Sequence, residues 1–140
     1  MFKRILLLLC LGWIVPLQAQ EQQPPESHYI FSIYFGGGSY YIDGEQVEDL
    51  GEWLDGIPNI ETHQISIHSH TDNIGSVRYN RWLSRMRSES ALQELLRKGI
   101  PSDIIDIADF GEESPVYDNR TWEGKLRNRR VDIIIRPLIM

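Results

Sequence analysis

The stretch HTDNIGSVRYNRWLSRMR, residues 70–87, decides the fold and holds the candidate site. It begins at the end of a strand-like segment, passes through a polar loop that contains Asp72, and enters a long helical pattern that Ser76 is placed to cap. Four residues recur at intervals of four and therefore share one side of that helix: Leu83, Arg87, Ala91 and Leu95. Arg87 is thus a cation in an otherwise apolar stripe, and a charge buried there needs an anion.

Asp72 and Arg87 together have the chemistry of a receptor for a zwitterion. Asp72 can accept hydrogen bonds from an ammonium group, while the guanidinium fork of Arg87 can hold a carboxylate through two parallel bonds. Asn80, on a neighbouring part of the same helix, can donate and accept beside them. Two interpretations stay open on these residues alone. One is a site for an amino-acid head group, and the other is a structural ion pair between Asp72 and Arg87 that fixes the loop to the helix.

The flanking sequence predicts alternating strands and helices. Gly99 and Pro101 mark a clear end to the helix that begins at Ser76. The patterns predict strands over residues 28–35, 62–70, 103–110 and 131–136, and helices over residues 44–56, 76–98 and 121–128. This order, βαβαβ(α)β, is typical of an α/β two-layer sandwich with helices packed on one sheet.

The first nineteen residues predict a secretory signal peptide. Lys3 and Arg4 precede an apolar run over residues 5–15, and Ala19 supplies a small residue for cleavage. A membrane span needs ~20 apolar residues, so this run is too short and we expect no transmembrane span in the mature chain. Cys10 lies between Leu9 and Leu11 inside the run, which favours an unmodified cysteine over a lipidated one.

The sequence after the signal peptide predicts one exported domain. Residues 20–27 are polar and contain two prolines, so we expect a short leader before a domain over residues 28–137. The chain of 140 residues has 14 basic and 20 acidic side chains, a net charge of −6. Without Lys3 and Arg4 the balance is 12 against 20, which disfavours nucleic-acid binding because that affinity rests on neutralising phosphates.

Two other classes of function compete with a zwitterion receptor. His68, His70 and Asp72 alternate along one segment, and imidazole and carboxylate groups suit zinc or iron, so a metal-dependent hydrolase is the sharpest alternative. The remaining histidines, His28 and His63, do not complete such a site, and we expect neither a metal nor another cofactor. With no cysteine in the mature chain and no nucleophile-elbow sequence, the chain is predicted to be non-enzymatic. The third class is a periplasmic scaffold that binds a protein partner.

The decisive stretch resembles the OmpA-like domain, which occurs in outer-membrane protein A, in peptidoglycan-associated lipoprotein and in flagellar stator proteins. The resemblance extends over most of residues 30–136, in order and with family-like spacing. The matching positions are His70-Thr71-Asp72, Gly75, Tyr79-Asn80, Leu83-Ser84, Arg87, Gly99-Ile100-Pro101, Phe110-Gly111-Glu112, Pro115, Asp118-Asn119, Glu123-Gly124 and Asn128-Arg129-Arg130-Val131.

The resemblance implies an OmpA-like sandwich with one mixed sheet that binds peptidoglycan non-covalently, through the meso-diaminopimelate residue of its stem peptide. Asp72 and Arg87 would be the main gripping pair, Asn80 and Arg129 would support them, and Thr71 would shape the loop. The chain departs from the family at Gly36, where an aspartate often follows the phenylalanine that ends the first strand. The expected location is the periplasm or cell envelope, including association with the outer membrane, with other envelope proteins as further partners.

Overall fold

The computed structural model describes residues 28–138 of the chain. The elements, in chain order, are β1 (Tyr29–Tyr34), α1 (Gly44–Asp55), η1 (Ile60–Thr62), β2 (His63–His70), α2 (Val77–Arg97), η2 (Ser102–Ile104), β3 (Ile105–Gly111), α3 (Trp122–Asn128) and β4 (Arg130–Pro137). The predicted order of four strands and three helices is confirmed. The predicted signal peptide, residues 1–19, and polar leader, residues 20–27, lie outside the described residues.

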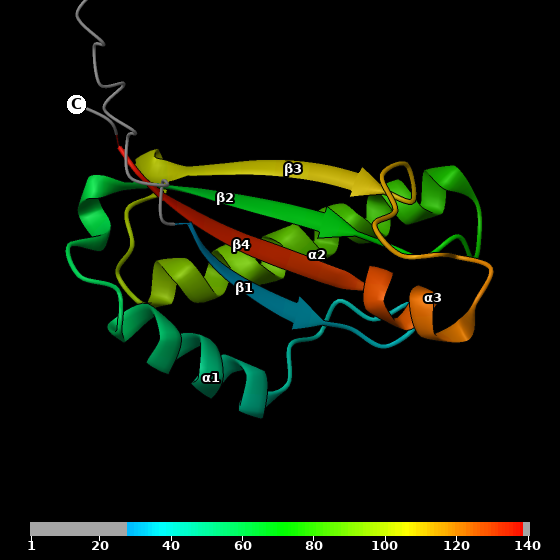
Figure 1. Cartoon of the computed structure of the whole chain (residues 1–140), viewed down its shortest axis with the longest axis horizontal. Coiled ribbons are helices and arrows are strands. Elements are labelled where there is room, and N and C mark those ends of the chain that lie inside the picture. The colour runs from blue at the N-terminus through cyan, green and yellow to red at the C-terminus, as the bar shows by residue number, and fades with distance from the viewer. Residues whose placement is uncertain (1–27, 139–140) are drawn as a thin grey trace, which may run out of the picture.

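The four strands form one mixed sheet in the order β1-β4-β2-β3 (Figure 1). β4 pairs antiparallel with both β1 and β2, and β2 pairs parallel with β3. The strand that comes last in sequence therefore lies inside the sheet, between β1 and β2. This confirms the predicted α/β class and adds the strand order, which periodicity does not reveal.

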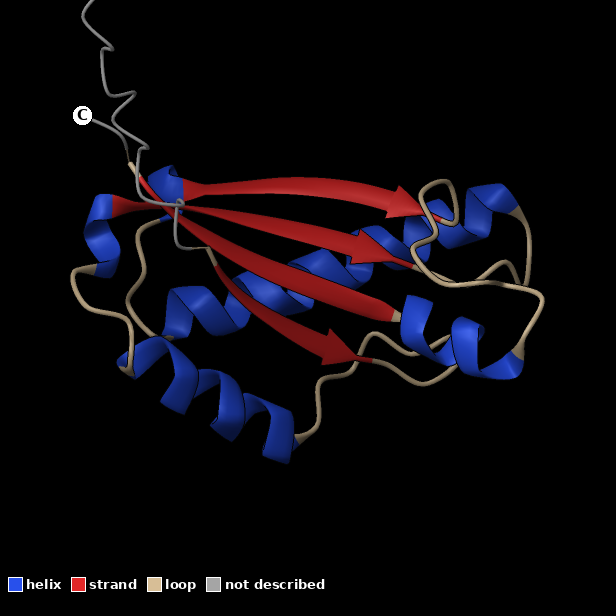
Figure 2. Cartoon of the chain, viewed as in Figure 1, coloured by secondary structure: helices blue, strands red, loops and turns tan. Residues whose placement is uncertain are grey.

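Helices α1 and α2 pack on the same face of the sheet, where alternate strand residues form the core. In Figure 2, α2 runs behind the strands and α1 lies beside β1, while α3 stands beyond the end of the sheet where β4 begins. The fully buried core side chains include Ile33, Ile65, Ile67, Leu95, Ile133 and Ile135. The two long helices confirm the predicted layer of helices on one sheet, and the short helix α3 lies at the end of the sheet that carries the candidate site.

Side chains and one glycine set the ends of the long helix α2. The Ser76 hydroxyl accepts from the backbone N–H of Tyr79, which confirms the predicted N-cap. At the other end, Gly99 adopts a φ of 82°, and the N–H groups of Gly99 and Ile100 donate to Leu96 and Leu95. This is the Schellman arrangement that a glycine makes accessible. The Ser76 cap fixes the start of α2 directly after the loop that carries Asp72.

A second glycine brings β3 against the first turns of α2. Gly111 has a φ of 56°, and a Cβ built there would lie 3.2 Å from the backbone nitrogen of Arg81 and 3.3 Å from the carbonyl carbon of Asn80. The parallel register between β2 and β3 shifts at this point, so that His70 lies opposite Gly111. The close approach places Glu112 next to Asn80, and both residues line the candidate site.

Candidate ligand-binding site

Four segments that are far apart in sequence meet where β1 and β2 end and β4 begins. They are the loop over residues 36–39, the loop after β2, the first half of α2, and Arg129 just before β4. The N–H of Phe35 donates to the carbonyl of Arg129 at 2.9 Å, which joins the first and last of these segments. The structure therefore brings together all five residues that the sequence singled out: Thr71, Asp72, Asn80, Arg87 and Arg129.

Asp72 is ion-paired with Arg129. The Arg129 Nε donates to Asp72 Oδ2 at 2.6 Å, and both side chains are more than nine-tenths buried. The other carboxylate oxygen, Oδ1, accepts from the N–H of Ile74 at 3.0 Å, which holds the loop in place. The Arg129 guanidinium also lies 4.9 Å from the centre of the Trp122 ring, so α3 supports it from the outer side.

Arg87 is held by backbone carbonyls rather than by a carboxylate. Its three nitrogens donate to the carbonyls of Ser39 at 2.8 Å, His70 at 3.0 Å and Gly36 at 3.0 Å. Its side chain is 1% exposed and lies against the Phe35 ring. The direct ion pair between Asp72 and Arg87, one of the two interpretations left open by the sequence, does not form, because Asp72 pairs with Arg129. The carboxylate of Asp72 still acts on Arg87 through space.

Burial and a neighbouring cation weaken the proton affinity of Arg87. Burial lowers the pKa of Arg87 to about 10, the Asp72 carboxylate opposes that change, and the positive charge of Arg129 adds to it. Arg87 stays charged at neutral pH. Two cations thus share one close carboxylate, and the cluster of Asp72, Arg87 and Arg129 has an excess of one positive charge.

Three buried polar atoms near this cluster have no hydrogen-bond partner. Across residues 28–138 they are His70 Nδ1, Thr71 Oγ1 and Asn80 Oδ1. The amide nitrogen of Asn80, in contrast, donates to Glu112 Oε2 at 2.5 Å. Buried polar atoms in folded proteins are nearly always paired, so these unpaired atoms are exceptional. Thr71 Oγ1 and Asn80 Oδ1 lie on the segments that carry Asp72 and Arg87, whereas the His70 ring belongs to a separate network.

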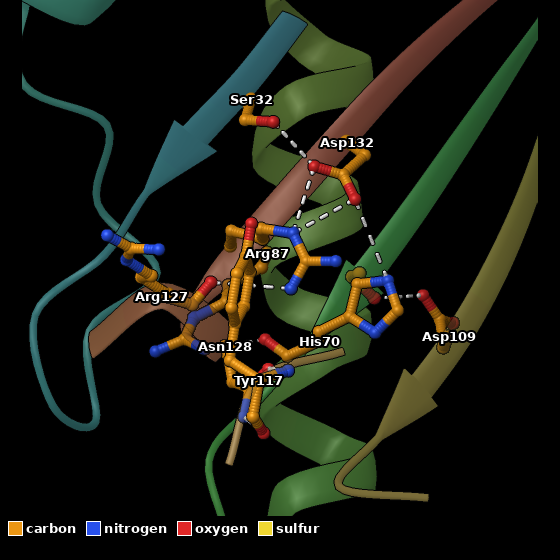
Figure 3. A network of polar contacts seen from close by, with 10 residues as sticks. Ser32, His70, Arg87, Asp109, Tyr117, Arg127, Asn128 and Asp132 are labelled. Atoms are coloured by element: carbon orange, nitrogen blue, oxygen red, sulfur yellow. Dashed lines mark hydrogen bonds and ion pairs between the residues drawn. The ribbon is translucent and has the colours of Figure 1, made fainter. Parts of the chain in front are cut away.

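His70 joins the site to a polar network on the open face of the sheet (Figure 3). Its ring stacks on Phe110 with centroids 5.2 Å apart, and its Nε2 lies 3.9 Å from Asp132 Oδ2. Asp132 also accepts from Ser32 at 2.6 Å and from Arg130 at 3.0 Å. Figure 3 shows the His70 ring pointing toward Asp132 and away from Arg87, to which His70 offers only its carbonyl.

The arrangement of His68, His70 and Asp72 gives no support to a metal-dependent hydrolase. The His68 ring contacts Phe110 edge-on, the His70 ring stacks on the same phenylalanine, and Asp72 is bound to Arg129. In the described part of the chain, no three His, Cys, Asp or Glu side chains are grouped so as to hold a metal ion. The alternation along β2 that suggested metal ligands instead places both histidines on the open face of the sheet.

We expect the stability of the fold to decrease as the pH falls from about 6.5 toward 4, because His70 is buried uncharged. Burial lowers the pKa of His70 from 6.5 to about 4, so the unfolded chain binds this proton more tightly than the folded chain does. Uncharged His70 makes its full contribution to the free energy of unfolding above pH 6.5, and about 2 kcal/mol of that contribution is lost by pH 5. Urea unfolding at pH 6.5 and at pH 5 measures this loss. His70→Phe, which keeps the ring stack, is expected to remove most of the pH dependence, and an unchanged dependence would contradict this assignment.

The sequence alone did not identify every group at the site. Glu112 belongs to a matched motif, but only the structure shows that it binds Asn80. The carbonyls of Gly36, Ser39 and His70 carry no side-chain signal at all. Trp122, which supports Arg129, precedes the matched Glu123-Gly124 pair and could have been found only by knowing where α3 packs.

Comparison with known proteins places this site in a family. Residues 34–129 match the OmpA family. The chain belongs to the OmpA family. The match includes all five residues of the site and confirms the resemblance seen in residues 70–87.

Relatives of the chain within the OmpA family are proteins of the bacterial envelope. Outer-membrane lipoprotein YfiB of Pseudomonas aeruginosa is 37% identical over 103 residues, which are 74% of this chain and 61% of YfiB. Peptidoglycan-binding protein ArfA of Mycobacterium tuberculosis is 30% identical over 103 residues, which are 74% of this chain and 32% of ArfA. The chain thus spans less than two thirds of the length of each.

Solved structures of the family share the fold. The peptidoglycan-associated lipoprotein of Burkholderia pseudomallei matches with a TM-score of 0.63 and 25% identity, over 74% of this chain and 88% of that one. The periplasmic domain of Helicobacter pylori MotB matches with a TM-score of 0.65 and 17% identity, over 84% of this chain and 80% of that one. The relatives confirm the predicted location in the periplasm and cell envelope. Within residues 28–138, no helix has both the length and the apolar character to cross a membrane.

Proposed function

We propose that this OmpA-family domain binds peptidoglycan non-covalently and without catalysis, by holding the side-chain end of meso-diaminopimelate in the stem peptide. The observation that carries the proposal is the group of unpaired buried atoms, Thr71 Oγ1 and Asn80 Oδ1, beside a cluster with surplus positive charge. Further support comes from relatives whose names state peptidoglycan binding or association.

The charges of the cluster suit a group that carries an ammonium and a carboxylate on one carbon. A carboxylate that enters beside Arg129 can bind its guanidinium group. The buried positive charge of Arg87, whose three nitrogens donate to backbone carbonyls, attracts the same carboxylate through space. The ammonium then donates to Asp72, and the unpaired Asn80 oxygen offers it a further acceptor. Thr71 supplies a hydroxyl to the same group. Each half of the zwitterion therefore meets a group of opposite charge.

Gly36, where the family resemblance implies an aspartate, contacts Arg87 through its backbone. Its carbonyl accepts from Arg87 at 3.0 Å. This carbonyl positions the guanidinium but adds no negative charge to the site. We infer that Gly36 changes the strength of ligand binding and leaves the type of ligand unchanged.

Stem peptides that differ in one group test the proposal. Wild-type protein is expected to bind a tetrapeptide with meso-diaminopimelate about 30-fold more tightly than one with lysine, because lysine lacks the second carboxylate and leaves charged donors without an acceptor. Isothermal titration calorimetry measures both affinities. A third peptide, in which the side-chain carboxylate is amidated, keeps the shape and removes the charge, so its affinity should approach that of the lysine peptide. Equal affinities for all three peptides would refute carboxylate recognition.

A further inference from the structure

A row of exposed aromatic side chains leads away from the site along α2. It consists of Tyr79, Trp82, Tyr40 and Tyr41, which are between 41% and 74% exposed, and we call it the aromatic row. The Tyr79 and Trp82 ring centroids are 5.7 Å apart, and those of Trp82 and Tyr40 are 6.0 Å apart. Grouped aromatic surface of this kind is unusual on a soluble domain unless it contacts a ligand or partner.

The far end of the aromatic row opens into a groove between α2 and the segment before α1. The groove has a volume of about 520 Å³, and its lining includes Tyr40, Tyr41, Met86, Glu89 and Ser90. The Ser90 hydroxyl donates to the carbonyl of Tyr40 at 2.7 Å, which ties this segment to the helix. The volume is in the range of small-molecule sites, and the lining mixes ring faces with hydroxyl and carboxylate groups.

The aromatic row is continuous with the charged cluster. Ser39, whose carbonyl accepts from Arg87 at 2.8 Å, is followed directly by Tyr40. On the other side, a Cβ at Gly38 would lie 3.3 Å from the Tyr79 hydroxyl, so the loop that holds Arg87 also touches the first ring of the row. A polymer that places one group at the charged cluster would therefore carry its neighbouring groups over these rings.

We propose that the aromatic row and its groove bind the sugar rings of the glycan strand to which the stem peptide is attached. This inference rests on the proposed function. Two residues of the stem peptide separate the diamino acid from the sugar. An extended peptide of three residues spans about 10 Å. This length is comparable to the distance from Tyr79 through Trp82 to Tyr40 along the aromatic row. Aromatic faces pack against the C–H faces of a sugar, while tyrosine hydroxyls and the Glu89 carboxylate bind its hydroxyl groups.

Three soluble ligands separate the groove from the charged cluster. They are the diaminopimelate tetrapeptide, the same peptide attached to its disaccharide, and short glycan strands from which the stem peptides have been removed. Calorimetry on wild-type protein should show that the disaccharide strengthens binding of the tetrapeptide about fivefold to tenfold. Tyr41→Ala and Trp82→Ala should each lose most of this gain and keep the wild-type affinity for the bare tetrapeptide. Tyr34→Ala removes an equally exposed ring from the open face and should change neither value.

The outcomes distinguish the two proposals. Equal wild-type affinity for the tetrapeptide with and without its disaccharide would overturn the glycan groove and leave the proposed function standing. Variants that weaken both ligands equally would also overturn it, since the rings would then act only on the charged cluster. Binding of stripped glycan strands without any binding of the tetrapeptide would reject the proposed function and support the groove. A thermal melt followed by circular dichroism confirms that each variant is folded.

Discussion

Arg87→Met is expected to lower the free energy of unfolding by about 3–5 kcal/mol, because three carbonyls lose their donor and each unpaired buried acceptor costs about 1–3 kcal/mol. Methionine fills a similar space in the apolar stripe but donates no hydrogen bonds. The carbonyls of Gly36, Ser39 and His70 would then be left without the donor that holds them together. Urea unfolding measured by circular dichroism gives the difference directly.

The matched control for this variant lies two residues earlier on the same helix. Arg85 is exposed, so Arg85→Met should change stability by less than about 0.5 kcal/mol. Arg87→Lys retains the charge, but one ammonium cannot reach three carbonyls in the planar geometry that a guanidinium provides. We expect its stability to lie between wild type and Arg87→Met. Equal stability of Arg85→Met and Arg87→Met would show that the three carbonyl contacts contribute nothing.

Asp72→Asn is expected to weaken binding to diaminopimelate peptides by about 3 kcal/mol, which is more than about 100-fold, because the ligand ammonium loses its anion. The substitution keeps the shape of the side chain, and an amide oxygen can still accept from Arg129 or from the N–H of Ile74. We expect the variant to fold with reduced stability, because Arg129 and Arg87 lose their close carboxylate. Calorimetry with the peptide and co-sedimentation with purified sacculi measure the loss.

Asp118→Asn is the control for charge alone. Asp118 forms an exposed ion pair with Arg120, and contacts of that kind contribute little. This variant removes the same charge from the protein and should bind sacculi as wild type does. Retention of sacculus binding by a folded Asp72→Asn protein would reject Asp72 as a ligand contact and would favour a purely structural ion pair with Arg129.

The element pattern could be predicted from the sequence because it depends on local signals. Ser76 supplies a cap, Gly99 supplies a left-handed residue, and the alternation of Ile65 and Ile67 with polar residues defines one face of β2. The insertion of β4 between β1 and β2 depends on contacts between distant segments, which periodicity does not encode. The 3₁₀ turn over Ser102–Ile104, in which the N–H of Ile104 donates to the carbonyl of Pro101, replaces the start of the predicted third strand.

The burial of Arg87 could be predicted from the sequence, but its hydrogen-bond partners could not. A cation in an apolar stripe indicated a buried charge that needs partners, and Arg87 is 1% exposed. The sequence offered Asp72 as a candidate partner, whereas the structure shows that the backbone carbonyls of Gly36, Ser39 and His70 accept from Arg87. Every residue has a carbonyl, so composition cannot reveal which ones converge. The family motif did place Arg129 near Asp72, and the structure shows that it pairs with Asp72.

The central position of β4 also constrains how the chain folds. β1 and β2, which come first, do not pair with each other, and each is bonded to the strand that follows all the others. The pairings of β4 join residues that are 62 positions apart (Ser69 with Val131) to 106 positions apart (Tyr29 with Ile135). Pairings of such long sequence separation slow folding. Arg129 lies directly before β4, so its ion pair with Asp72 is completed only when this last segment docks between β1 and β2.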